Sequence, residues 1–489
     1  MRSYYQLQDD FGTVPICDIK FNLKSRDDIP KLLMALQYVY CTKELKDAVF
    51  AQLDAVIPKK ISRDTGRPGM NLWRILVLGT LRFGADCDFD RLKELVDHHR
   101  QVRQMLGFGA YDTEVTISLQ SIRDNVKLLT PDLLDDINQV IVGGGHTLVK
   151  KNEEDELRVR ADSFVVKTDV HYPTDSNLLY DAVRKIIHLS AKACKKAGLS
   201  VFRQSKHNLK KVKHLHRKLT KVHHSTSRDP KKREAKQEEI KATTESYLKL
   251  CRGYGERAKE VVNLLKCMEQ DMSVSLMGYQ VEIERFIGHA ERQMDQLRRR
   301  VIDGEIIPHE EKVFSLFEEH TEWIRKGKAG VPQELGVRVA LVEDQYKFIL
   351  HHQVMYGQTD EKVTVELVQE SQKRFGKFRS ASFDKGFYSP EVLKDVQKEV
   401  GLAVLPKKGR LTKKEKERES DPEFRTQRSR HAGIESAIHA LHHNGLDRCP
   451  DHGKVGFSRY VALAVVARNL LTLGSILLEQ QRRKGKKAA

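Results

Sequence analysis

The sequence lacks the features that mark secreted and membrane-spanning proteins. No apolar run approaches the roughly 20 residues that a spanning helix needs, and the opening MRSYYQLQDD contains no apolar signal segment. The seven cysteines are odd in number and form no CxxC pair, which is typical of reduced thiols and not of a disulfide framework. These absences predict a cytoplasmic protein that has no membrane partner.

Acidic residues are also in short supply. The chain has 86 Lys and Arg against 68 Asp and Glu, which gives a formal net charge of +18. A surplus of this size favours a polyanionic partner, and without a membrane segment nucleic acid is the preferred one. The length of 489 residues exceeds one ordinary hydrophobic core, so we expect several domains.

Residues 1–150 are predicted to form a helical N-terminal domain. Apolar residues recur at helical spacing over Ile29–Leu53 and Asn71–Phe83, and a third helix is predicted over Phe89–Leu106. Asp88 is placed to cap this third helix. Two interpretations stay open for the region: a helical domain that packs on its neighbour, or a helix-turn-helix-like module that binds DNA ends.

The periodicity changes at Leu157, where LRVRADSFVVKTDVHY predicts a strand or hairpin. A helix is expected to follow, capped by Asp175 or Ser176. We expect an α/β core in two parts, with a helical block inserted between them. The expected boundaries are 151–175 for the first part of the core, 176–305 for the insertion, 306–480 for the rest of the core, and 481–489 for a basic tail.

The inserted block is strongly basic, with fifteen Lys or Arg against two acidic residues between Lys192 and Ala235. Near its end, apolar residues from Ile283 to Val301 fall at steps of three or four, which predicts a coiled-coil-like seam. A solvated helix face explains such a charge run, but leucines among the cations favour a basic amphipathic helix along DNA phosphates. The predicted contacts are Lys210, Lys211, Lys213, Arg217 and Lys218.

The second part of the core alternates strands and helices. Strands are predicted over 312–324, 337–344 and 346–355, in a short segment that ends at Asp384, and in GLAVLPKKG. Helices are predicted over 361–375, after Ser389, and over 431–444 and 457–482. The basic segment 407–430 has few apolar residues, so we expect it to be a mobile loop.

Three isolated carboxylates in this pattern suit phosphoryl transfer with two divalent metal ions. Such chemistry needs a few acids that converge from separate elements, because Mg²⁺ prefers oxygen ligands and retains several waters. Asp162 lies in the first strand, Asp384 ends a later strand, and Glu435 lies early in a helix. Glu435 shares a polar helix face with His439 and His442, while Ile434, Ile438 and Leu441 form the apolar side.

Other residues were weighed against these three. Asp169 lies an odd number of positions from Asp162 and should point to the opposite face of the strand, and Asp175 is more simply a helix cap. The cluster His442, His443, Cys449 and His452 has the spacing of no standard zinc site. Trp323 is a packing residue in preference to a stacking platform for a base.

Three segments in order resemble the insertion-sequence transposases of bacteria, nearest the ISNCY-type group: RADSFVVKTDVHYPTDSNLLYDAVR, SFDKGFYSP and RSRHAGIESAIHAL. The resemblance implies an α/β RNase H-like catalytic core with a helical N-terminal domain and a long helical, coiled-coil-like insertion. It also implies a DDE triad of metal ligands that binds Mg²⁺ or Mn²⁺. By motif the triad is Asp162 in D-S/T-x-V, Asp384 in D-x-G-F/Y-Y-S, and Glu435 in G-I/V-E-S.

The resemblance also implies partners and an activity. The expected enzyme is a transposase that cleaves double-stranded DNA at element ends and joins them to target DNA, as a homodimer in a synaptic complex at the bacterial nucleoid. Related transposases carry Arg and Lys where this chain has His431 and His442. The alternatives are a host nuclease or recombinase on the same fold and a non-enzymatic DNA-binding protein. The predicted DNA contacts near the triad are Arg428, Arg430, His431, His439, His442 and Arg448.

Overall fold

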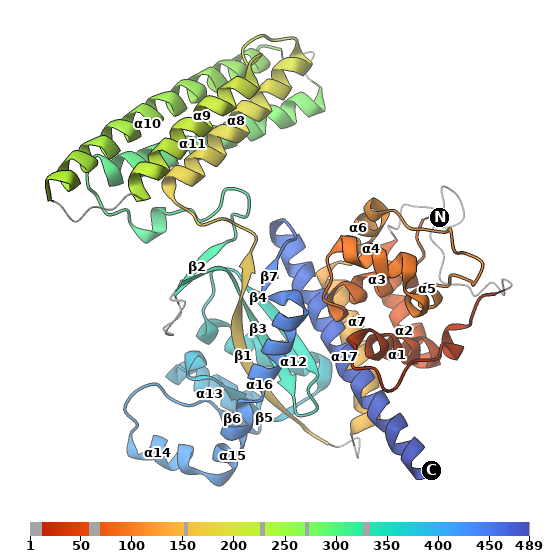
Figure 1. The fold of residues 1–489 in the computed structure, drawn as a ribbon. Helices are drawn as coiled ribbons and strands as arrows, with labels where there is room; N and C mark the ends of the chain where they lie inside the picture. The colour runs from red at the N-terminus through yellow and green to blue at the C-terminus, as the bar shows by residue number, and fades with distance from the viewer. Residues whose placement is uncertain are drawn as a thin grey trace. The chain divides into compact units, whose positions relative to one another are not determined.

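The chain divides into two compact units. The computed structural model describes residues 12–57, 69–150, 155–224, 230–268, 273–325 and 333–488. The first unit comprises Met1–Asp169 and Glu322–Ala489, and the second comprises Val170–Thr321. The polypeptide therefore leaves the first unit after one strand and returns to it at Glu322 with the rest of the sheet (Figure 1).

Among the described residues, seven α-helices precede the first strand. Two of the predicted helices are each broken in two. Ile29–Leu53 is interrupted at Thr42, and Phe89–Leu106 is interrupted at His99, whose backbone is extended and whose ring accepts the amide of Val102. Asp88 caps its helix as predicted. The helices are α1 (Asp28–Cys41), α2 (Lys43–Leu53), α3 (Leu72–Gly84), α4 (Phe89–His98), α5 (Arg100–Met105), α6 (Leu119–Val126) and α7 (Pro131–Val149).

A seven-stranded mixed sheet forms the centre of the first unit. Its main path runs β2-β3-β1-β5-β6, with β4 paired to β3 and β7 paired to β1. β1 is antiparallel to β3 and parallel to β5 and β7, and β5 is parallel to β6. The strands are β1 (Leu157–Thr168), β2 (Glu322–Arg325), β3 (Gln333–Asp344), β4 (Ile349–Met355), β5 (Phe378–Phe383), β6 (Leu402–Val404) and β7 (Arg448–Cys449).

The two parallel neighbours of β1 leave a gap between them. β5 pairs with β1 only as far as Ala161, and β7 pairs with it from Lys167 onward. Residues 162–166 of β1 thus have no strand partner on this side among the described residues. The gap lies directly beyond the end of β5. Side chains of β1 and of the turn after β5 can therefore reach this opening in the sheet.

Helices connect and cover the strands: α12 (Asp360–Phe375), α13 (Pro390–Glu399), α14 (Lys413–Ser420), α15 (Pro422–His431), α16 (Ile434–Leu441) and α17 (Gly453–Ala488). Ser389 caps α13 as predicted. The prediction of a mobile loop over 407–430 was wrong. Thr412 and Glu415 form a capping box for α14, Asp421 caps α15, and Phe424 of α15 is buried. The predicted strand over 312–324 is also shorter, because only Glu322–Arg325 pairs with β3.

One hydrophobic core joins the N-terminal helices to the sheet. Buried residues from α1, α3 and α7 pack in the same cluster as those of β1, β3 and β5. Most residues of α17 from Phe457 to Leu473 are buried in it. The sequence suggested that no segment has the length and apolarity of a membrane-spanning helix, but Gly453–Lys484 has both. Of its most apolar window, 78% is buried in the protein. This apolarity belongs to a core helix.

The second unit is helical and has its own core. The predicted seam is confirmed, since Ile283, Ile287, Ala290 and Leu297 of α11 are buried against the other helices. The expected cap of α8 was wrong: the side chain of Thr174 accepts the amide of Asn177, and Asp175 is the first helical residue. The helices are α8 (Asp175–Ala197), α9 (Ser205–His224), α10 (Pro230–Lys266) and α11 (Val274–Val301).

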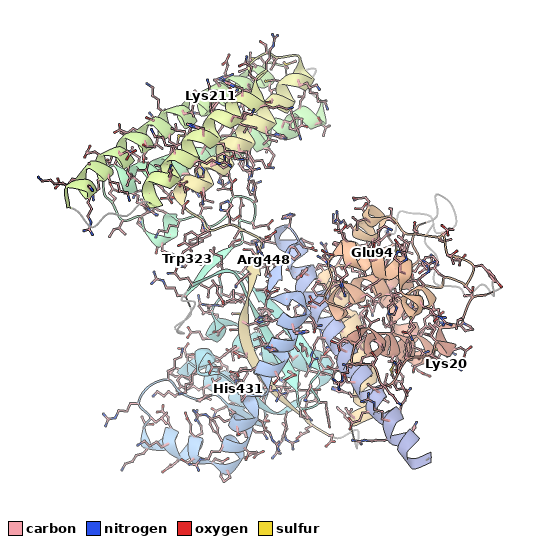
Figure 2. All side chains as sticks on the ribbon, viewed as in Figure 1. Lys20, Glu94, Lys211, Trp323, His431 and Arg448 are labelled. Carbon is pink, nitrogen blue, oxygen red and sulfur yellow. A yellow bond between two sulfur atoms is a disulfide. The ribbon has the colours of Figure 1, made fainter. Side chains whose placement is uncertain are left out.

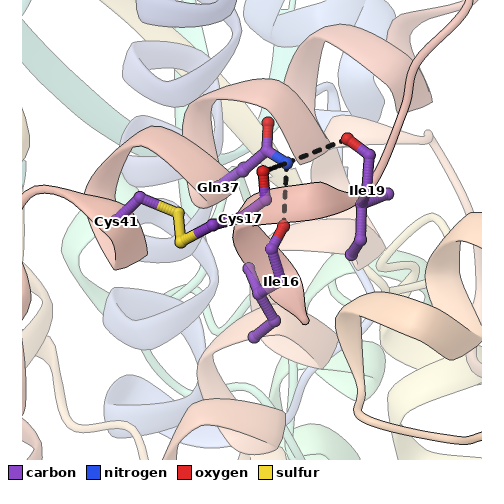
Figure 3. Close-up of a disulfide and its surroundings, with 5 residues drawn as sticks. All are labelled: Ile16, Cys17, Ile19, Gln37 and Cys41. Atoms are coloured by element: carbon purple, nitrogen blue, oxygen red, sulfur yellow. Dashed lines mark hydrogen bonds between the residues drawn. A yellow bond between two sulfur atoms is a disulfide. The ribbon is translucent and has the colours of Figure 1, made fainter. Parts of the chain in front are cut away.

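A disulfide joins Cys17 to Cys41, so the expectation that all cysteines are reduced was wrong (Figure 3). A short helical turn, Ile16–Asp18, places Cys17 beside the C-terminus of α1 with a Cα–Cα distance of 5.8 Å. The side-chain amide of Gln37 holds this turn by donating to the carbonyls of Ile16, Cys17 and Ile19. The chain separation of 24 residues gave no sign of this contact in the sequence.

Candidate active site

A cavity of about 810 Å³ opens at the gap in the sheet. Its walls come from β1, β2, β3, the end of β5 and the helices α12, α15 and α16, so residues that are far apart in the sequence meet there. The three predicted acids Asp162, Asp384 and Glu435 all line it. The full lining is Asp162, Ser163, Phe164, Val165, Ile324, Arg325, Arg338, Asp360, Asp384, Gly386, Lys408, His431, Ala432, Ile434, Glu435, Ile438, His439 and His442.

Strand register places the first two acids. Ala161 pairs with Phe383 across the parallel β1–β5 ladder, and Asp162 and Asp384 are the next residues of the two chains. β1 continues past this point while β5 ends, so Asp384 lies in an exposed turn and Asp162 lies partly buried inside the strand. The amide of Ser163 donates to Asp162 Oδ1 at 2.7 Å, which orients the carboxylate.

Helix α16 brings Glu435 to the same cavity. Ile434 and Leu441 are buried, and Glu435 and His439 lie on the exposed side. His442 follows the helix, and its ring packs edge-on against Phe164 of β1 with the centroids 5.2 Å apart. Ile438, expected on the inward side, is only half-buried and lines the cavity. The helix predicted over 431–444 is confirmed: α16 begins three residues later than expected, and a π-helical segment, His442–Leu446, continues it.

A fourth carboxylate, Asp360, lines the cavity and was not singled out from the sequence. It is the first residue of α12, and its Oδ1 accepts the hydroxyl of Ser163 at 2.7 Å. A Cβ built on Gly386 would lie 3.2 Å from Asp360 Oδ2 and 4.0 Å from Asp384 Oδ2. The two carboxylates therefore approach one point from different elements. An acid in the first turn of a helix is ordinary, so the sequence gave no signal.

The surroundings of Asp162 make its carboxyl group costly to ionise. Burial, together with the nearby charges of Asp384, Asp360 and Glu435, raises the pKa of Asp162 to about 6, against the effect of the Ser163 amide. A partly buried acid that faces three others carries an unbalanced negative charge. Such a group favours a cation or a proton in the cavity.

Positive side chains line the same cavity. Arg325 ends β2, Arg338 lies in β3, and Lys408 follows β6. None of these three was predicted to line the site, because each lies in a segment whose sequence is typical of an ordinary strand or a basic loop. Acids at the centre with cations at the walls suit a substrate that carries phosphates and a metal ion together.

His431, which Figure 2 labels, also lines the cavity. It is the last residue of α15, and its Nδ1 is 3.3 Å from Ser382 Oγ. Burial lowers the pKa of its imidazole, although Asp384 acts to raise it. Its ring is therefore a neutral hydrogen-bonding group near pH 7.

The other predicted DNA contacts are divided between this cavity and other parts of the surface. His439 and His442 line the cavity, but Arg428 and Arg448 do not. Arg428 is 3.2 Å from Glu419, and Arg448 of β7 pairs with Asp169. Arg430 lines a second cavity. The five cations predicted on α9 (Lys210, Lys211, Lys213, Arg217 and Lys218) are all exposed, and Figure 2 labels Lys211 among them.

The four acids supply only oxygen donors, which is the chemistry that Mg²⁺ and Mn²⁺ prefer. Among the residues that the structure describes, no three His, Cys, Asp or Glu side chains are gathered closely enough to hold one ion. The four carboxylates thus fit a hard divalent cation. Their side chains would have to move closer together to bind one ion. The exposed positions of Asp384 and Glu435 leave both side chains free to rotate.

Residues 294–470 match the family model of the transposase DDE domain. The match supports a DDE transposase. No curated protein and no solved structure gives a significant match to the chain. The matched residues contain Asp384 and Glu435, while Asp162 precedes them in the sequence. The DDE domain implies an RNase H-like core, and the mixed sheet of the first unit agrees with it.

Proposed function

We propose that this protein is an active DDE transposase, which cleaves DNA at the ends of a mobile element and joins the new 3′-hydroxyls to target DNA. The observation that supports this most is the meeting of Asp162, Asp384 and Glu435 in one cavity, from a strand, a strand end and a helix. Only the fold brings together residues separated by 222 and 51 positions.

In this proposal Asp162, Asp384 and Glu435 are the metal ligands. Bound Mg²⁺ or Mn²⁺ would lower the pKa of an attacking water and stabilise the leaving oxygen. Asp162 is oriented by the Ser163 amide, and its raised pKa is what a ligand shows before a cation neutralises its surroundings. Asp384 and Glu435 are exposed to the cavity. Their side chains would turn toward the ion, one from the end of β5 and the other from α16.

The cations of the cavity wall would hold the DNA. Arg325, Arg338 and Lys408 are placed to contact phosphates that flank the scissile bond. His431, His439 and His442 would contribute hydrogen bonds at the same surface. The exposed cations of α9 would bind phosphates without regard to sequence, as would Arg428, Arg430 and Arg448 in the first unit.

The remaining assignments extend the resemblance. We place the protein in the ISNCY-type group of bacterial insertion sequences, acting at the nucleoid in the cytoplasm, with double-stranded element ends and target DNA as its partners. A homodimer would join two ends in one synaptic complex. The helical region 1–150 would bind element ends. The three acids and the DDE-domain match favour this enzyme over a DNA-binding protein without activity.

Cleavage of a labelled duplex that spans the boundary of the mobile element tests the proposal. With Mg²⁺ or Mn²⁺ the full-length protein should cut at that boundary, and EDTA should stop it. Asp162→Asn, Asp384→Asn and Glu435→Gln should each abolish cutting, with DNA affinity within a few-fold of the unmodified protein. Asp169→Asn is the matched control, because that acid pairs with Arg448 outside the cavity. Cutting by any of the three variants would remove that residue from the triad.

A further inference from the structure

A second cavity of about 420 Å³ lies along the same strands as the first. It is lined by Arg158 and Arg160 of β1, Ser382 of β5, and residues of α15 and of the turn before α16. Three arginines line it together with one acid, Asp344, and several neutral polar residues. The complete lining is Arg158, Val159, Arg160, Asp344, Gln345, Ser382, Gln427, Ser429, Arg430 and Gly433.

The pleat of β1 ties this cavity to the acids. Side chains two positions apart point to the same face of a strand and lie about 6.7 Å apart along it. Arg158, Arg160 and Asp162 therefore follow one another on one face, and Val159 and Ala161 between them are buried. On β5, Ser382 pairs with Arg160, and Asp384 lies two residues further on.

His431 and Ser382 form the boundary between the two cavities. His431 lines the first cavity, Ser382 lines the second, and their side chains are 3.3 Å apart. A linear molecule that leaves the acids along β1 would thus reach the arginines next. This order of groups suits a chain of phosphates.

The arginines of the second cavity differ in how they are held. Arg160 donates from Nε to Glu343 at 2.6 Å and from Nη1 to the carbonyl of Arg430 at 3.1 Å. A Cβ on Gly433 would lie 2.1 Å from Arg160 Nη1, so the guanidinium packs directly on that glycine. Arg160 therefore fixes the wall of the cavity, and its charge is offset by Glu343.

Arg158 and Arg430 supply the uncompensated charge. Both are exposed, and neither guanidinium has an ion pair with any described residue. The one acid in the lining is Asp344, which is fully buried; it accepts His146 Nε2 at 2.6 Å and the amides of Tyr346 and Phe348. The cavity thus presents two free cations and the hydroxyl of Ser429.

We propose that this second cavity is a phosphodiester-binding subsite, in which Arg158 and Arg430 hold a backbone phosphate of the same DNA strand whose scissile bond lies at the acids. The inference rests on the proposed function, because it assumes that DNA occupies the first cavity. Its role is to fix the register of the strand, since phosphate contacts position DNA without reading its sequence.

Binding measured without chemistry tests the subsite. The protein carries Asp162→Asn in the full-length chain, and its affinity for a fixed 30-base-pair duplex is measured in EDTA over a range of salt. Each phosphate contact contributes about −0.9 to the slope of log affinity against log salt in duplex DNA. Because both arginines hold one phosphate, Arg158→Gln with Arg430→Gln should make the slope about 1 less steep. Arg158→Lys with Arg430→Lys should leave most of the slope in place.

Arg379→Gln is the matched control, because Arg379 is an exposed arginine of β5 that pairs with Glu423 and lines neither cavity. A slope unchanged by the two glutamines, with DNA still bound, would overturn the subsite and leave the transposase proposal intact. No DNA binding at low salt would overturn both. Inorganic phosphate at constant ionic strength should not stabilise the protein to heat; stabilisation that the glutamine variant loses would assign the cavity to a free phosphate ligand instead.

Discussion

Asp162 and Asp384 are neighbours across the parallel pairing of β1 with β5, each one residue beyond the paired Ala161 and Phe383. β5 ends there and β1 continues, so the two carboxylates meet where the sheet opens. This arrangement makes their charges interdependent, and the first two predictions follow from it.

Without metal, Asp162 should destabilise the folded protein above pH 6. Its pKa in the folded protein is about 6, above the ordinary value of 3.8, so folding retains a proton that the unfolded chain releases. The protonated carboxyl of Asp162 contributes fully to the free energy of unfolding below pH 4. This contribution is lost as the pH rises through 6, which lowers the free energy of unfolding by about 1–3 kcal/mol. Asp162→Asn should thus unfold at a higher temperature than the unmodified protein at pH 8 in EDTA, and at a similar one at pH 4. Equal melting temperatures at pH 8 would contradict this.

Divalent metal should reverse that penalty. Mg²⁺ or Mn²⁺ that binds only the folded protein raises its stability in proportion to the logarithm of metal concentration. Thermal unfolding should therefore shift upward with added metal, and the shift should be much smaller in Asp384→Asn and in Glu435→Gln. Ca²⁺ provides an ion of another size as a comparison, and equal shifts in all variants would place the metal elsewhere.

Asp360 should tune metal affinity without being essential. Its carboxylate adds negative charge beside Asp384 and holds the hydroxyl of Ser163. We expect Asp360→Asn to require several-fold more Mg²⁺ for half-maximal cleavage, with most of the activity restored at saturating metal. Glu361→Gln, at the exposed next position of α12, should leave the metal requirement unchanged. A complete loss of cleavage at saturating metal would instead make Asp360 a ligand.

The exposed cations of α9 should contribute to the salt dependence of DNA binding. Replacing Lys210, Lys211, Lys213, Arg217 and Lys218 by Gln should weaken binding to all duplex sequences alike and flatten the salt slope. The comparison is a second set of five Gln replacements in the same helical unit, at cations that already have acidic partners. Equal slopes for the two sets would make α9 a solvated surface. The second set is Lys259, Lys266, Arg285, Arg298 and Arg299.

The Cys17–Cys41 disulfide should stabilise the first unit by restricting the unfolded chain. A closed loop of this length contributes about 3 kcal/mol in the chain-entropy account. Cys17→Ser should therefore lower the unfolding temperature, and dithiothreitol should lower that of the unmodified protein to the same value. Cys267→Ser, at an exposed free cysteine, should change neither. An unfolding temperature indifferent to reductant would show that the bond makes no contribution.

Two of the three predicted acids could be found in the sequence because each interrupts a clear local pattern. Asp162 is a lone acid in a β-branched strand, and Glu435 is a lone acid beside the apolar positions of a short helix. Arg338 and Lys408 do not interrupt the local pattern of the segments in which they lie. They reach the cavity only through the pairing of β3 with β1 and through the path of the chain after β6, which local periodicity does not encode.

The helices and strands were predictable where the apolar periodicity was strong. They were predicted wrongly where a few contacts determine whether a segment is helical. The segment 407–430 has a polar composition that suggests a loop, yet Phe424 and two well-formed helix caps are enough to order it. His99 breaks a helix whose apolar spacing continues through it, because its ring caps the next one. Such choices rest on single hydrogen bonds, and these leave little trace in composition.

The return of the chain to its first unit at Glu322 governs when the candidate site is completed. During synthesis β1 emerges early with Asp162, but every strand that pairs with it is encoded after the helical unit. A domain that needs such distant contacts closes late, whereas the helical unit, whose contacts are local, can fold first. Nascent and truncated chains therefore carry the basic helices without a completed set of acids; under the proposed function they would bind DNA before they could cut it.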